Sequence, residues 1–303
     1  MGDEAIAFFA ALCGVTRMDK QTELTIVRQA YAKQILAAAG VNDARIESAY
    51  AAVRREDFLG PGPWEIVRSG NYVRTPSDDP VYLYTNDLVG IIPERQINNG
   101  EPSFHATLIN QAAPAAGEHV VHVGAGVGYY SAIFAELVGK SGRVTAIEYL
   151  PELATRAKAN LRGYSNVEVL QGDGAVTPFR EAHVVYVNAG ATRPADIWLD
   201  QLAEGGRLVL PLTTDKGFSD TFGKITSGLV FRIERRGDAY LANWLSSVAI
   251  FPCAGSRDEE SELALAEALG KGGEQKVTRL YRDNLLPEER CWLRTSGWCL
   301  AYS

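Results

Sequence analysis

Residues 120–130 read Val-Val-His-Val-Gly-Ala-Gly-Val-Gly-Tyr-Tyr, a β-branched run that leads into three closely spaced glycines. The run from His119 to Val123 predicts a buried strand, and the apolar spacing from Tyr129 to Val138 predicts a helix directly after the glycines. Glycine in such a turn admits backbone conformations and a ligand approach that a Cβ would block. We therefore expect the first strand–loop–helix unit of an α/β fold here, with a ligand against the loop.

The same alternation continues along the chain. Strands are predicted at Arg143–Glu148, Val167–Leu170, Val184–Val187 and Arg207–Leu210, and helices at Pro151–Leu161 and Pro194–Ala203. Strands that alternate with helices form parallel sheets with helices on both faces, and their ligands lie at the carboxyl ends of the strands. The fold class predicted is an α/β, doubly wound, Rossmann-like sheet.

Other elements flank this centre. Helices are expected at Ala5–Val15, at Leu24–Ala38 before Gly40, and after Asn42 and Asp43, whereas Gly60–Pro80 resembles a loop. Beyond Pro211 we expect strands at Gly228–Glu234 and Ser246–Phe251, a helix at Ser256–Leu269, and sheet-completing strands within Cys291–Tyr302. This divides the chain into an N-terminal helical cap (1–60), a substrate-loop region (61–115), a cofactor-binding core (116–216) and a C-terminal extension that completes the sheet (217–303).

Composition narrows the class of protein. The 303 residues are 46% apolar and 22% charged, which is typical of a globular chain. A net charge of −7 gives no general attraction to nucleic acid or anionic lipid, and no apolar run is long enough to span a membrane. The four cysteines are scattered without a C-x-x-C pair, so we expect no metal site and reduced thiols in a cytoplasm.

Three features point to one ligand. The third glycine, Gly128, comes one residue earlier than a dinucleotide fingerprint requires, which favours an adenosyl ligand without a pyrophosphate. Glu148 ends the next predicted strand and can accept hydrogen bonds from both ribose hydroxyls. Asp173 follows the strand after that and can accept from the adenine amine. Together they predict that the chain binds S-adenosyl-L-methionine.

Longer motifs resemble one family. They are Gly40–Asp43, Val53–Phe58, Tyr149–Leu153, Gly172–Gly174 and Leu202–Pro211. Over Thr25–Leu212 the chain resembles the protein-L-isoaspartate O-methyltransferases, a branch of the class I S-adenosylmethionine-dependent methyltransferases. The resemblance implies a modified seven-stranded sheet and methyl transfer to a carboxylate of a peptide or small molecule. The cofactor residues expected are His122, Gly124, Ala125, Gly126, Gly128, Tyr129, Glu148, Tyr149, Gly172, Asp173 and Gly174.

The substrate region departs from the family pattern. Where the family carries S-x-P-x-x-x-A, this chain has Gly100-Glu-Pro102-Ser103-Phe-His105-Ala106, so a glycine replaces the serine hydroxyl. We predict substrate contacts from Gly100, Pro102, Ser103 and Asn188. Histidines also replace two acids usual in such domains, at positions 122 and 183. We expect His122 to face the methionine part of the cofactor, and His119 and His183 to be hydrogen-bonded structural residues.

The acceptor decides what catalysis requires. A carboxylate is already ionised at pH 7 and needs no base, so the main task is in-line positioning of acceptor and methyl group. An alcohol or phenol would need a base within hydrogen-bond reach, for which His105 is the candidate. Three alternatives stay open: an O-methyltransferase with an altered substrate loop, a non-catalytic cofactor-binding module, and a nicotinamide oxidoreductase, which the position of Gly128 disfavours. The sequence carries no signal for the oligomeric state.

Overall fold

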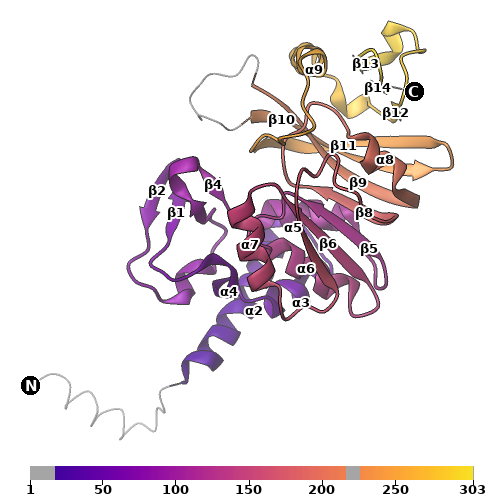
Figure 1. Ribbon diagram of the computed structural model, residues 1–303. Helices are drawn as coiled ribbons and strands as arrows, with labels where there is room; N and C mark the ends of the chain where they lie inside the picture. Colours follow the sequence, from indigo (N-terminus) through magenta and orange to yellow (C-terminus); the bar gives the residue numbers. More distant parts are fainter. Residues whose placement is uncertain (1–17, 216–225, 303) are drawn as a thin grey trace, which may run out of the picture.

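The computed structural model describes residues 18–215 and 226–302 and is built on a ten-stranded mixed sheet (Figure 1). The strand order is β13-β14-β12-β11-β10-β9-β8-β5-β6-β7. Five strands are parallel: β5 (His119–Val123), β6 (Arg143–Glu148), β7 (Val167–Gln171), β8 (Ala182–Val187) and β9 (Leu202–Thr214). The other five are antiparallel to their neighbours: β10 (Thr226–Arg236), β11 (Ala239–Ile250), β12 (Arg279–Tyr281), β13 (Cys291–Arg294) and β14 (Cys299–Ala301).

The parallel half confirms the predicted alternation, but the sheet is larger than the family resemblance implied. Three strands, β12, β14 and β13, extend it from seven strands to ten. They come from residues 279–301, so the predicted strands within Cys291–Tyr302 are confirmed. The prediction for Pro194–Ala203 was too long, because the helix α8 covers only Asp196–Asp200 and β9 already begins at Leu202.

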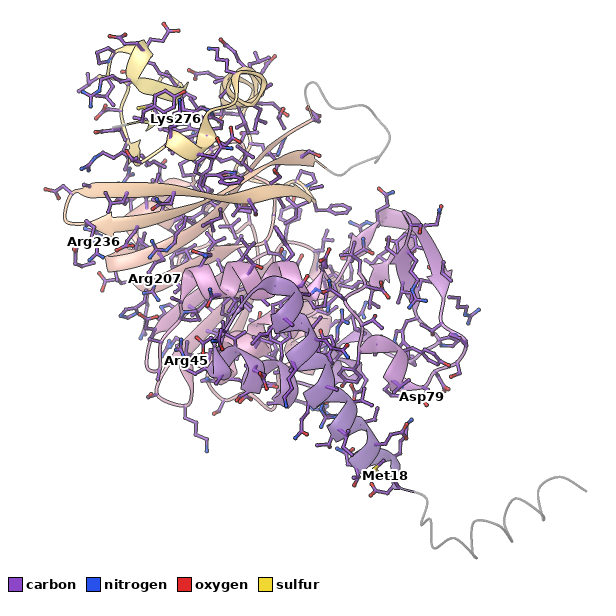
Figure 2. All side chains as sticks on the ribbon, turned by 180° about the vertical axis from the view of Figure 1, so that it is seen from behind. Met18, Arg45, Asp79, Arg207, Arg236 and Lys276 are labelled. Atoms are coloured by element: carbon purple, nitrogen blue, oxygen red, sulfur yellow. The ribbon has the colours of Figure 1, made fainter. Side chains whose placement is uncertain are left out.

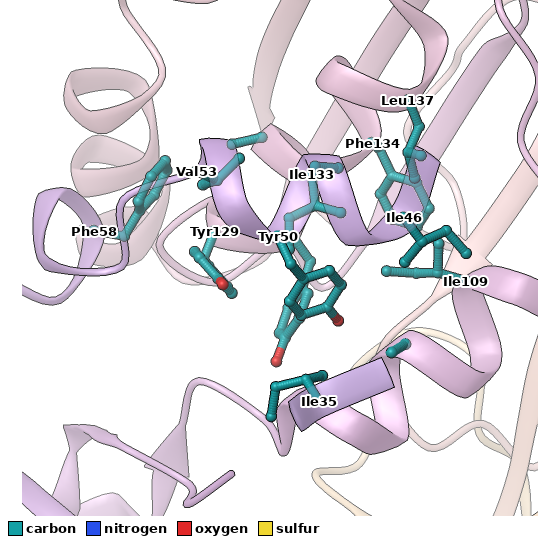
Figure 3. Packing of buried hydrophobic residues seen from close by; sticks show 14 of the residues in the cluster. Ile35, Ile46, Tyr50, Val53, Phe58, Ile109, Tyr129, Ile133, Phe134 and Leu137 are labelled. Atoms are coloured by element: carbon teal, nitrogen blue, oxygen red, sulfur yellow. The ribbon is translucent and has the colours of Figure 1, made fainter. Parts of the chain in front are cut away.

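Helices cover both faces of the sheet. One face carries α2 (Lys20–Ala39), α3 (Ala44–Ala52), α4 (Glu56–Leu59), α5 (Pro102–Ala112), α6 (Tyr129–Val138) and α7 (Pro151–Asn160), and the other carries α8 and α9 (Glu259–Lys271). Successive side chains of β5 alternate between the two cores: Val120 packs with the first group and Val121 with the second. Figure 3 shows part of the first core, where Tyr50 and Ile133 lie between α3 and α6.

The N-terminal helices begin and end at the residues that the sequence marks. The Asp19 side chain accepts a hydrogen bond from Thr22 N at 3.0 Å, and α2 stops at Gly40, whose φ of 64° is left-handed. Asp43 caps α3 through Arg45 N at 2.8 Å. The helix predicted at Ala5–Val15 lies outside the described residues.

The prediction of a loop over Gly60–Pro80 is wrong for the middle of this segment. Strands β1 (Glu65–Arg68) and β2 (Asn71–Arg74) form a hairpin there, and β3 (Gly90–Ile92) pairs with β4 (Ile97–Asn98) further on. The two residues of the hairpin turn, Ser69 and Gly70, both have positive φ, the conformation that tight hairpins favour. Because Gly, Pro and Asp are frequent on both sides of this turn, the sequence pattern did not distinguish a short hairpin turn from a long loop.

Two arginines hold the connection between α5 and β5, and Figure 2 labels both of them. Arg207 Nε donates to Ala112 O at 2.9 Å, and its guanidinium also pairs with Glu118. Arg45 Nη1 donates to Pro114 O at 3.1 Å. The start of β5, and with it the glycine loop, is therefore fixed against α3 and β9.

Arg55 is a fully buried cation that joins the helices to the following loop. Its guanidinium donates to three backbone carbonyl oxygens, those of Leu83, Thr85 and Asp87. It also lies over the rings of Tyr31 and Tyr129, at 5.7 and 5.6 Å from their centroids. Within the described ranges no acidic side chain forms a salt bridge with it, so carbonyl groups and aromatic rings alone stabilise its charge.

Arg55→Ala should lower the free energy of unfolding by about 3 kcal/mol or more, because three buried carbonyls lose their donor and a cavity opens beneath two rings. Urea denaturation followed by circular dichroism measures the change. Exposed Arg74 is the matched control, and Arg74→Ala should stay within about 0.5 kcal/mol of wild type. Equal stability of the two variants would contradict the role assigned to Arg55.

Candidate functional site

A cavity of about 750 Å³ opens at the carboxyl ends of β5, β6 and β8 and beside the loop after β7. This is the edge at which a doubly wound sheet binds its ligand. It brings together ten of the predicted site residues: Gly100, His105, Gly124, Ala125, Gly126, Glu148, Tyr149, Asp173, Gly174 and Asn188.

The three loop glycines serve different purposes. All have positive φ, at 77° for Gly124, 57° for Gly126 and 93° for Gly128. A Cβ on Gly124 would lie 2.9 Å from Asn188 O, and one on Gly128 would lie 2.7 Å from Leu161 Cδ1. A Cβ on Gly126 would meet only Ile91 Cδ1, at 4.0 Å. Gly124 and Gly128 therefore allow tight packing, whereas Gly126 borders open space.

Glu148 fixes this loop from the neighbouring strand. Its Oε2 accepts from Gly126 N at 2.7 Å, and its Oε1 accepts from Leu150 N at 2.9 Å. A carboxylate has about four lone-pair sites, so two remain for further donors such as ribose hydroxyls. Burial raises the pKa of this carboxyl above its ordinary value, although backbone donors at Leu150, Gly126 and Tyr149 oppose the shift.

Asp173 is held between its own loop and the C-terminal extension. Its Oδ1 accepts from Ala175 N at 2.9 Å. The next residue, Gly174, is fixed by a hydrogen bond of 2.7 Å from Trp198 Nε1 to its carbonyl oxygen. A Cβ on Gly255 would lie 1.8 Å from Asp173 Oδ2, so the extension packs directly on the carboxylate. Nothing local in the sequence signals this contact.

Four predicted cofactor residues do not reach the cavity, which corrects the expectation for them: His122, Gly128, Tyr129 and Gly172. Tyr129 is 1% exposed and its ring packs beside Phe58 in the core, as Figure 3 shows. A Cβ on Gly172 would lie 2.6 Å from Thr177 Oγ1, so Gly172 permits a close turn.

His122 lies on the core side of β5 and is fully buried. Its Nδ1 is 2.8 Å from Ser131 Oγ, and its ring packs against Phe134 and Tyr186. Burial lowers its pKa to about 3, so the ring is neutral at pH 7. His119 and His183 are hydrogen-bonded structural residues as predicted, since His119 N donates to His183 Nδ1 at 3.1 Å.

The expected substrate loop is in part a helix. Pro102 starts α5, and neither it nor Ser103 lines the cavity. Ser103 Oγ donates to Glu101 Oε1 at 2.7 Å and accepts from Asn86 Nδ2 at 2.8 Å, so its hydroxyl is engaged in fixing the helix start. The prediction of substrate contacts from these two residues is therefore corrected.

His105 lines the cavity from the first turn of α5 and is 2% exposed. Its ring stacks on Tyr130 with centroids 3.7 Å apart, and its Nδ1 is 2.8 Å from Tyr186 OH. A Cβ on Gly100 would lie 2.3 Å from His105 Nε2. The imidazole thus occupies the space that a side chain at position 100 would need. Burial lowers the pKa of His105 to about 3.

No local sequence pattern predicts which residues form much of the cavity wall. It comes from the β3–β4 hairpin, from residues 247–254 and from Arg257. Arg257 Nη1 donates to Gly190 O at 2.9 Å, and its Nη2 pairs with Glu262 at 2.9 Å. These contacts depend on the long-range packing of the extension against β8 and β9, which periodicity does not reveal.

In residues 18–215 and 226–302, no group of three or more His, Cys, Asp or Glu side chains is placed to hold a metal ion. No helix in the described part of the chain is long and apolar enough to cross a membrane.

The parallel half of the sheet, with a glycine loop after β5, an acid at the end of β6 and another after β7, has the arrangement of a class I methyltransferase fold. Solved structures agree. A protein-L-isoaspartate O-methyltransferase aligns with a TM-score of 0.60 at 24% identity, covering 80% of this chain and 68% of its own. A Plasmodium falciparum structure described as a beta-aspartate methyltransferase, in complex with S-adenosyl-L-homocysteine, aligns with a TM-score of 0.57 at 16% identity, covering 75% of this chain and 97% of its own. At these sequence identities the structural similarity shows a shared fold and no more.

The sequence identifies the family. The profile of the protein-L-isoaspartate(D-aspartate) O-methyltransferase family matches residues 33–234, so the chain belongs to that family. A relative from Ignicoccus hospitalis is 36% identical over 155 residues, which are 50% of this chain and 69% of the relative. One from Archaeoglobus fulgidus is 48% identical over 100 residues, 32% of this chain and 46% of the relative. Both are protein-L-isoaspartate O-methyltransferases.

Family membership confirms several predictions together. The chain is a class I methyltransferase that depends on S-adenosyl-L-methionine, and the alternative of a nicotinamide oxidoreductase is not favoured. The alignments leave part of each relative unmatched, and residues 235–303 lie outside the family profile.

Proposed function

We propose that this protein transfers a methyl group from S-adenosyl-L-methionine to the side-chain carboxylate of an isoaspartyl residue in a peptide or protein. The observation that carries the proposal is the shape of the cavity. A single space runs from the glycine loop at Gly126 to the residues around Gly100 and His105. Methyl donor and acceptor can therefore meet in line without a movement of the sheet.

The residues of the first half fit the cofactor. Gly126 leaves room for its methionine part, the free lone pairs of Glu148 suit the two ribose hydroxyls, and Asp173 suits the adenine amine. Ala125, Tyr149 and Gly174 complete this wall. The cofactor supplies an electrophilic methyl group on a sulfonium, and the protein has to orient the acceptor and exclude competing water.

The isoaspartyl assay is the direct test. Labelled S-adenosyl-L-methionine and a short isoaspartyl peptide should give a base-labile methyl ester, whereas the same peptide with normal aspartate should give little. Ester formation on another oxygen acceptor but not on the isoaspartyl peptide would favour the alternative of an altered substrate specificity. Failure to bind S-adenosyl-L-homocysteine in calorimetry would leave only a module without catalysis.

Glu148→Gln should weaken S-adenosyl-L-homocysteine binding by roughly 10- to 100-fold, because the amide NH₂ would face backbone donors and lose acceptor capacity. In wild type the affinity should fall as the pH is lowered, with a midpoint above the ordinary carboxyl value of 4.5, since burial raises the pKa of Glu148. Calorimetry at several pH values measures both effects. Glu168→Gln, on the exposed side of β7, is the control. Unchanged affinity in Glu148→Gln would remove this residue from the site.

Gly255→Ala should reduce cofactor affinity about tenfold or more with the fold retained, because the new methyl would displace the Asp173 carboxylate. Gly297→Ala lies in the same extension with no atom within 4 Å of its Cβ position, and should bind as wild type does. Thermal unfolding of both variants separates lost binding from lost stability. Identical affinities would show that the extension does not position Asp173.

Cys253, Cys291 and Cys299 are free thiols, and Cys13 lies outside the described residues. The cytoplasmic location, the absence of a nucleic-acid partner and the four-part division of the chain stay predictions.

A further inference from the structure

The β3–β4 hairpin, residues 90–98, forms one wall of the cavity and is firmly held at its base. On one side Val67 N, in β1, donates to Leu88 O at 2.9 Å. On the other side Tyr72 OH, in β2, donates to Asn98 Oδ1 at 2.7 Å. The β1–β2 hairpin therefore fixes the base of the β3–β4 hairpin through both of its strands.

The tip of the hairpin, Pro93–Gln96, is held by much less. Within the described residues, its one hydrogen bond to a residue outside the hairpin is from Arg95 Nη1 to Glu152 Oε1, at 2.7 Å. Gln96 N bonds only to Pro93 O, inside the tip. Glu152 lies in the first turn of α7, and the two segments lie side by side in Figure 1. A single ion pair thus joins the tip to the helices that cover the sheet.

This ion pair connects two walls of the cavity. Arg95 lines the cavity from the hairpin, and Leu153, the residue after Glu152, lines it from α7. The hairpin also lies over the glycine loop, because Ile91 Cδ1 is 4.0 Å from the position that a Cβ on Gly126 would take. The space in which we place the methionine part of the cofactor therefore lies between the glycine loop and the hairpin, with the ion pair at its edge.

The strength of the pair follows from its exposure. Both side chains are nearly half exposed, and an exposed ion pair shifts an equilibrium by a factor of roughly two to five. Both partners belong to the protein, so the pair stabilises the closed hairpin equally whether or not a ligand fills the cavity. It adds nothing to the affinity for a ligand, but the hairpin cannot move away from α7 until the pair breaks.

We propose that the β3–β4 hairpin is a gate over the cofactor half of the cavity and that the Arg95–Glu152 ion pair is the latch that keeps it closed. The proposal rests on the proposed function for the position of the cofactor. Arg95 and Glu152 are then positioning residues. Loss of the latch should speed cofactor entry and exit by the same factor and leave Kd unchanged, because free and loaded protein lose the same stabilisation.

Charge reversal at either end of the latch tests this expectation. Arg95→Glu and Glu152→Arg each place two like charges together, so the association and dissociation rate constants for S-adenosyl-L-homocysteine should both rise by roughly 3- to 20-fold, with Kd within about twofold of wild type. This ligand has no net charge at pH 7, so altered steering would not produce the effect. Surface plasmon resonance measures both rates.

Two further variants serve as controls. The double exchange of Arg95→Glu with Glu152→Arg restores an ion pair and should return both rate constants to within about twofold of wild type. Lys271→Glu reverses one end of an exposed ion pair on α9, 2.6 Å long and formed with Glu267, and should leave the rates unchanged. A merely structural effect of the substitutions would not be reversed by exchanging the two charges.

Ionic strength provides an independent measurement. Raising sodium chloride from about 0.05 to about 0.5 M screens exposed charges, so both rates should rise in wild type and stay nearly constant in Arg95→Gln. A raised Kd in Arg95→Glu at an unchanged association rate would make Arg95 a ligand contact and overturn the proposal. Wild-type rates in both charge reversals would overturn it too, because the cofactor would then pass elsewhere. Protein with the expected rates that forms no ester on isoaspartyl peptide contradicts only the proposed function.

Discussion

The hydrogen bond from Gly126 N to Glu148 Oε2, 2.7 Å long, links the loop after β5 to the end of β6. A loop of alternating glycines would sample many conformations by itself, because glycine carries no steric preference for negative φ. The carboxylate selects one of them and leaves its remaining lone pairs facing the cavity. In the site that we propose, the same group shapes the loop and binds the ligand, so cofactor binding and loop conformation depend on one side chain.

The rest of the fold keeps that link in place from three directions. Arg207 and Arg45 hold the chain just before β5, and α6 packs behind the loop through Gly128, which admits Leu161 at a distance no side chain would allow. From the far side, the C-terminal extension closes on Asp173 through Gly255. Each contact joins segments that are distant in sequence, which is why the cavity depends on the whole sheet and not on the glycine loop alone.

Local features of the sequence predicted the half of the site that local residues build. The strand–glycine–helix order located Gly124, Ala125 and Gly126, and strand-end position located Glu148 and Asp173. Patterns could not show which way each side chain faces: His122 and Tyr129 turned out to lie in the core. The tight Ser69–Gly70 turn was hidden among other turn residues. Nor could they show that residues 247–257 return to the cavity, because that depends on the antiparallel pairing of β11 with β10.

Two pairs of positions show that residues inside and outside the family profile together form the cavity. At one end, the imidazole of His105 fills the space beside Gly100, so any side chain at position 100 requires a smaller residue at position 105. At the other end, the Asp173 carboxylate fills the space beside Gly255, a residue outside the family profile. A single substitution in either pair creates an overlap that its partner would have to relieve. Residues at the two ends of the cavity are therefore constrained in pairs, and the extension forms part of the cavity wall.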